Sequence, residues 1–206
     1  QTNQIPKNTQ KLQALQLYWK NKHILFMIIL FALNWNAYSS LLPDWGRAHG
    51  FDSVQSEKLT IFLYLGVALF SVPLSFLARI YSKKFLFYIF YGFVSVCLII
   101  VNYMSKFLSV AFIYTLVGGV IMSGWPLVAA LVGDRFQGQK LSIMTSGFLL
   151  VQTVVGIPIL YMGGVVLEFT GPHVFNIAMF MLNGIFLSAI YKSYPKEKTK
   201  DLFKRM

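Results

Sequence analysis

The chain has 206 residues, of which 56% are hydrophobic and only 12% charged, and its formal net charge is +11. Soluble domains usually carry about twice that charged fraction, so the composition excludes an ordinary soluble protein and indicates an integral membrane protein. The positive residues lie between and outside long apolar runs, so they indicate membrane topology and no nucleic-acid partner is expected. Cys97 is the single cysteine, which excludes an internal disulfide framework and a CxxC metal site.

The amino-terminal residues 1–23 are polar and contain four lysines. We interpret them as a cytoplasmic linker, and a short amphipathic helix lying on the membrane surface over residues 11–22 is the alternative. The chain starts at Gln1, and no basic segment followed by a short apolar core marks a signal peptide. The chain is therefore expected to be a fragment of a longer protein.

Six runs without any Asp, Glu, Lys, Arg or His follow, each close to or above the roughly 20 residues that a helix needs to cross a membrane. The runs are Ile24–Leu42, Leu59–Ala78, Phe85–Ser105, Phe107–Gly133, Leu141–Leu167 and Val174–Tyr191. We therefore predict an all-α bundle of six transmembrane helices over residues 24–191, with a polar connector at residues 43–57 and a basic cytoplasmic tail at 192–206. The third run is the most uniformly apolar, and we expect it to face lipid most.

The basic residues are distributed asymmetrically about these runs. Fifteen of the 18 Lys and Arg residues lie in the terminal segments and in the second and fourth connectors, and three lie in the other connectors. Because connectors rich in Lys and Arg stay in the cytoplasm, both termini are predicted to be cytoplasmic. The plasma membrane is the expected location.

Polar side chains inside the runs are candidates for lining a solute path, because lipid offers no hydrogen-bond partner. The candidates are Asn34, Asn36, Tyr64, Trp125, Ser146 and Gln152. Asn34 and Asn36 lie on different sides of one helix, so both face protein only if that helix is largely enclosed. For Tyr64 and Trp125 the alternative is core packing.

The fifth run carries a polar stripe on one helical face. Its members are Ser142, Thr145, Ser146, Leu149, Gln152, Thr153 and Gly156. The alternative to a solute path is hydrogen bonding between helices or to the carbonyl four residues earlier. We favour that alternative for Ser142 and Thr153, and Gln152 fits either. Gly119 and Ser123 form a small-residue pair that lets helices approach closely.

An enzyme is not expected. No HExxH zinc motif is present, and His23, His49 and His173 lie at the ends of the runs, where they cannot serve as a membrane-embedded base. No metal or other cofactor is expected. Proton coupling usually needs an ionisable side chain inside the membrane, and the six runs contain no Asp, Glu, Lys, Arg or His. These runs are therefore not expected to supply a proton-coupling residue.

Several short motifs carry a family resemblance. Asp134 closes the fourth run, Gly156-Ile157-Pro158-Ile159 lies in the fifth, and Glu168-Phe169-Thr170-Gly171 follows it. With Leu41-Leu42-Pro43-Asp44 near the start, these motifs resemble the carboxy-terminal half of the monocarboxylate transporter family, which belongs to the major facilitator superfamily.

Two departures from that family are visible. The connector after the second run, residues 75–84, resembles a superfamily signature, but Arg79 stands where that signature has an Asp. The run Leu59–Ala78 lacks the Asp and Arg that proton-coupled members carry. The resemblance thus implies the fold and solute transport, and it does not carry over monocarboxylate chemistry residue by residue.

The resemblance implies helices seven to twelve of a twelve-helix transporter that works by alternating access. It implies that the first, second, fourth and fifth runs border the solute path. The expected partners are the lipid bilayer, a small organic solute, with monocarboxylates as one class, and a missing amino-terminal half or a second copy. The alternative is a structural or accessory membrane protein that transports nothing.

Overall fold

The computed structural model describes residues 16–193, and within that range it consists of helices and short connectors without a strand. The helices are α2 (Lys22–Ala48), α3 (Ser53–Ile80), α4 (Lys83–Val101), α5 (Phe107–Arg135), α6 (Gln139–Thr170) and α7 (Pro172–Ser193). All six are long and apolar enough to cross a membrane. The predicted six-helix bundle is confirmed.

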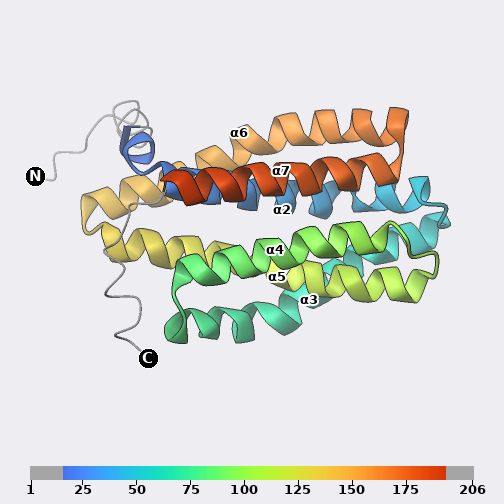
Figure 1. The fold of residues 1–206 in the computed structure, drawn as a ribbon, viewed down its shortest axis with the longest axis horizontal. Helices are drawn as coiled ribbons and strands as arrows, with labels where there is room; N and C mark the ends of the chain where they lie inside the picture. The colour runs from blue at the N-terminus through green and yellow to red at the C-terminus, as the bar shows by residue number, and fades with distance from the viewer. Residues whose placement is uncertain (1–15, 194–206) are drawn as a thin grey trace, which may run out of the picture.

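The six helices alternate in direction, so that consecutive helices run antiparallel (Figure 1). The helix α2 begins and α7 ends at the same end of the bundle, where the α3–α4 and α5–α6 connections also lie. The tertiary structure therefore gathers the basic connectors at one end. The side of the membrane that this end faces stays a prediction.

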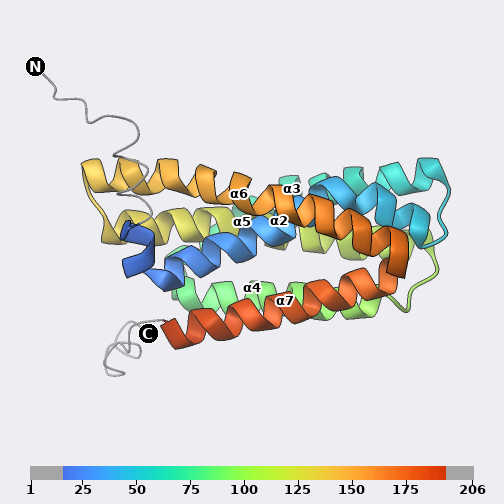
Figure 2. The ribbon, with the colours of Figure 1, turned by 90° about the horizontal axis from the view of Figure 1, so that it is seen from above.

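The helix α2 occupies the centre of the bundle and packs against α3, α5, α6 and α7 (Figure 2). On one side of it α3 packs along α5, and on another α4 packs against both α5 and α7. This central position encloses α2, so that residues on different sides of it, including Asn34 and Asn36, are in contact with protein.

The first connector is shorter than predicted, because α2 continues through Pro43 to Ala48. Trp45 is fully buried, and its Nε1 donates a hydrogen bond to the carbonyl oxygen of Pro172 at 3.2 Å. Asp52 then caps α3 by accepting a hydrogen bond from the Gln55 backbone at 2.7 Å. Pro43 lies inside α2, where it cannot donate a backbone hydrogen bond to the preceding turn.

The predicted amino-terminal linker is partly structured. Residues 16–20 are helical, and Tyr18 is only 1% exposed. Its hydroxyl donates a hydrogen bond to the carbonyl oxygen of Met144 in α6. This turn of the predicted linker is therefore packed against the bundle through Tyr18. The rest of the linker and nearly all of the predicted tail lie outside the described residues.

The close contact between α3 and α5 depends on glycine. A methyl group on Gly66 would stand 1.7 Å from the Thr115 carbonyl oxygen, and one on Gly118 would stand 2.1 Å from that of Leu63. Gly119 also faces α3, where it lies against Phe70 and the backbone of Gly66. The predicted packing role of Gly119 is confirmed. The hydroxyl of Ser123 donates a hydrogen bond to the Gly119 carbonyl oxygen of the same helix at 2.7 Å.

Exposure is concentrated on α3 and α6, contrary to the expectation for the third run. Only 12% of the most apolar window of α3 and 17% of that of α6 is buried, against 50% for α4. The helix α4 is covered because it lies against α5 and α7. The large exposed apolar side chains of α3 and α6 include Ile61, Leu65, Leu69, Val72, Leu149, Val154, Ile157 and Met162.

Candidate functional site

Asn36 lies at the contact between α2 and α6. Its side chain stands so close to Gly156 that a methyl group there would be 3.0 Å from the Asn36 Oδ1. One amide hydrogen of Asn36 is donated to the Ala32 carbonyl oxygen at 2.8 Å. An amide oxygen accepts up to two hydrogen bonds, so Asn36 keeps acceptor capacity beside α6.

Tyr64 and Trp35 extend the same region toward α3. The two rings pack edge to face, with their centroids 5.8 Å apart, and Tyr64 is 47% exposed. Because Trp35 and Asn36 are neighbours in sequence, this turn of α2 contacts α3 through Trp35 and α6 through Asn36.

Trp125 links α5 to the same group of helices. Its ring packs edge to face on Phe148 of α6, with a centroid distance of 3.9 Å, and lies 6.0 Å from the ring of Phe31 in α2. Phe31 precedes Trp35 by one turn, and Phe148 precedes Gln152 by one turn. Gln152, which is half-buried, therefore lies on α6 between the contact with Trp125 and the contact with Asn36.

The structure thus groups four of the six candidates. We call Trp35, Asn36, Tyr64, Trp125, Phe148 and Gln152 the inner-face cluster. Ser146 lies two residues before Phe148, on an exposed part of α6, and donates a hydrogen bond to the Ile143 carbonyl oxygen at 3.0 Å.

Asn34 lies apart from this cluster. It is fully buried and exchanges side-chain hydrogen bonds with Asn183 of α7, at 2.7 Å and 3.3 Å. It also donates to the Leu30 carbonyl oxygen at 2.9 Å. Its polar atoms are therefore engaged by protein, on the side of α2 that faces α7.

The comparison with protein families decides the identity of the bundle. A family model described as Major Facilitator Superfamily matches residues 7–205. The chain belongs to the Major Facilitator Superfamily. No curated protein matches it.

Membership of the superfamily makes the chain a multi-pass membrane protein of the secondary-transporter class, which moves small solutes, and its six-helix bundle corresponds to half of the superfamily fold. The sequence resemblance is thereby confirmed at the level of the superfamily. The narrower resemblance to the monocarboxylate transporter family stays a prediction.

Sequence reasoning missed several polar partners of this Major Facilitator chain. Asn183 pairs with Asn34, and Asn176, also fully buried, donates to the Asn102 Oδ1 at 2.8 Å and accepts from the Tyr38 hydroxyl at 3.4 Å. The sequence did hold a signal, because Asn176 and Asn183 lie two turns apart in an apolar run, where unpaired amides are costly.

The predicted hydrogen bond of Thr153 to its own helix is confirmed. Its Oγ1 lies 3.0 Å from the Leu149 carbonyl oxygen, and Thr145 bonds in the same way to Leu141 at 2.9 Å. These hydroxyls are satisfied locally. Among the cluster residues on α6, Gln152 is the one whose side chain can both donate and accept hydrogen bonds.

Proposed function

We propose that this chain forms one wall of a solute path that operates by alternating access, and that the inner-face cluster contacts the solute. The proposal rests on one observation: an uncharged group of aromatic and amide side chains joins α2 and α5 to α3 and α6, the two least-buried helices. The face between α3 and α6 is not covered by the other helices that the structure describes. Such a face suits one side of an aqueous path between the two halves of a transporter.

The side chains of the cluster suggest distinct contacts. Gln152 and Asn36 supply amide donors and acceptors, and Tyr64 supplies a hydroxyl on a half-exposed ring. Trp125 supplies an apolar surface. Ser146, which lies outside the cluster, would add a hydroxyl nearer the start of α6. We assign Asn34 to packing between α2 and α7, because its amide is paired with Asn183.

The cluster suits a small organic solute that is neutral, or whose charge is met elsewhere. None of its side chains, which are those of Trp, Asn, Tyr, Phe and Gln, carries a charge at neutral pH. A monocarboxylate would therefore need a cation from the opposing wall. That wall is an amino-terminal six-helix half or a second copy, and it covers the exposed apolar side chains of α3 and α6.

The proposed orientation places both termini in the cytoplasm, because the basic connectors lie at the end where α2 begins. We propose the plasma membrane as the host membrane.

Solute uptake into liposomes tests the proposal. The chain is reconstituted alone and with an amino-terminal six-helix partner, and uptake of labelled neutral solutes and monocarboxylates is measured. Gln152→Leu should lower uptake severalfold at unchanged abundance, whereas its neighbour Thr153→Val, whose hydroxyl bonds to its own helix, should not.

Two results would contradict the proposal. Equal loss of abundance and uptake in Gln152→Leu would make Gln152 a packing residue. Absence of uptake with every solute and partner would favour the alternative, an accessory membrane protein that uses the exposed faces of α3 and α6 only for assembly.

A further inference from the structure

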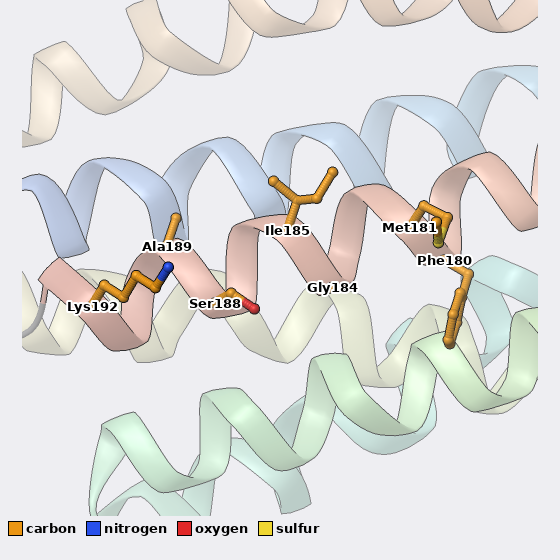
Figure 3. A pocket seen from close by; sticks show the side chains of 7 residues that line it. All are labelled: Phe180, Met181, Gly184, Ile185, Ser188, Ala189 and Lys192. Carbon is orange, nitrogen blue, oxygen red and sulfur yellow. The ribbon is translucent and has the colours of Figure 1, made fainter.

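A hollow lies on the outward side of α7, away from the inner-face cluster. Its volume is about 590 Å³. It is lined by Phe180, Met181, Gly184, Ile185, Ser188, Ala189 and Lys192 (Figure 3). Gly184 and Ser188 leave a notch on the helix, because a methyl group on Gly184 would meet no atom within 4 Å.

The walls of this notch are apolar. Figure 3 shows Phe180 directed toward α4 and Ile185 directed away from it, with Met181 beside Phe180 on the near side of α7. Met181 is 59% exposed and Ile185 62% exposed, so both present apolar surface outward. Exposed apolar walls around small residues fit a flexible hydrocarbon chain.

One end of the notch is basic. Lys192 lies in the last turn of α7, and its side chain extends back along the helix toward Ala189 (Figure 3). Lys84, at the start of α4, lies with its Nζ 5.7 Å from the centroid of the neighbouring Tyr191 ring. An anionic group at this end of the notch would therefore meet the ammonium group of Lys192.

We propose that the notch binds an anionic phospholipid, with an acyl chain between Phe180 and Ile185 and the headgroup phosphate at Lys192. From Phe180 to Lys192 the helix rises about 18 Å. One leaflet contributes about half of the ~30 Å hydrocarbon core, so the notch matches a single acyl chain below its headgroup. Basic residues at the cytoplasmic ends of helices attract anionic lipids.

A second copy of the chain fits this surface less well. A parallel two-fold contact centred on Gly184 would bring the Lys192 residues of both copies to the same level, where like charges repel. A lipid phosphate neutralises Lys192 instead. The charge at the end of the notch therefore favours lipid over a second α7.

The test is native mass spectrometry of the full 206-residue chain, released from detergent with added phosphatidylglycerol or phosphatidylcholine. We expect phosphatidylglycerol to bind in preference, and glycerol phosphate without acyl chains not to compete. Lys192→Gln should weaken phosphatidylglycerol binding about fivefold. Gly184→Leu, which fills the notch, should weaken binding of the lipid to a similar extent.

Matched variants give the control. Lys140→Gln removes an exposed lysine at the same end of the bundle, and Gly92→Leu adds the same side chain at an open glycine of α4. Both should bind phosphatidylglycerol as the unaltered chain does. Equal binding of the two lipids, loss with Lys192→Gln but not with Gly184→Leu, or a dimer abolished by Gly184→Leu would each overturn the proposal.

Discussion

Asn34 in α2 and Asn183 in α7, which are 149 residues apart in sequence, exchange two side-chain hydrogen bonds in the interior of the bundle. Both side chains are fully buried. Lipid and apolar side chains offer no hydrogen-bond partners, so each amide depends on the other for its hydrogen bonds. The pair therefore holds α7 against the central helix α2.

The first prediction concerns this pair. Asn183→Leu should lower the free energy of unfolding by about 1–2 kcal/mol, because it leaves the Asn34 amide with unpaired groups in an apolar interior. The double variant Asn34→Leu, Asn183→Leu should recover part of the loss. Denaturant unfolding in detergent measures both, with Ile177→Leu on the exposed side of α7 as the control.

A different outcome would move Asn34 into the solute path. Asn34→Leu would then retain full stability and change the apparent affinity for the transported solute.

The second prediction concerns the contact between α3 and α5. Gly118→Ala should destabilise the bundle by about 1–3 kcal/mol, because its methyl group would collide with the Leu63 backbone, which cannot rotate away. Gly92→Ala meets no atom within 4 Å, and should be neutral or slightly stabilising through helix propensity. Thermal unfolding compares the two, and equal melting temperatures would refute the close approach.

The third prediction concerns an ion pair at the basic end of the bundle. Lys83 Nζ lies 2.5 Å from Asp134 Oδ2, which ties the start of α4 to the end of α5. Because the Asp134 side chain is 60% exposed, Asp134→Asn should cost less than about 1 kcal/mol, and the cost should shrink at high salt. Unfolding at two salt concentrations checks this, and a loss above about 2 kcal/mol would show that the pair is far less solvated than its exposure indicates.

The fourth prediction concerns topology. In a Cys97→Ser background, Ser105→Cys in the α4–α5 connector should react with a membrane-impermeant maleimide added to intact cells. Gln137→Cys in the α5–α6 connector should react only after permeabilisation. Both positions are exposed, so access is set by the membrane and not by burial. The reversed pattern would place the basic end outside.

The sequence indicated the number and approximate limits of the membrane helices, because length and hydropathy are local properties. The predicted helix limits were wrong where a locally polar stretch is nevertheless helical and packed against the bundle. Asp44 and Arg47 suggested a connector, yet they form an exposed ion pair on a helix that Trp45 anchors. Tyr18 sat in a polar stretch, yet its hydroxyl reaches α6.

Among the candidate side chains, the sequence identified the costly polar groups but not their partners. Asn34 and Asn36 are only two residues apart, but they face different helices. Asn34 pairs with a buried amide of α7, whereas Asn36 lies beside Gly156 of α6. Sequence separation hides such partners.

By itself, then, the sequence determined that the chain is a six-helix membrane bundle with its basic connectors on one side. Only the tertiary structure decided which helices are enclosed, which are uncovered, and which amides are paired. The physical reason is that lipid and protein interior are equally apolar, so a membrane helix carries little hydrophobic signal about which of its faces turns inward.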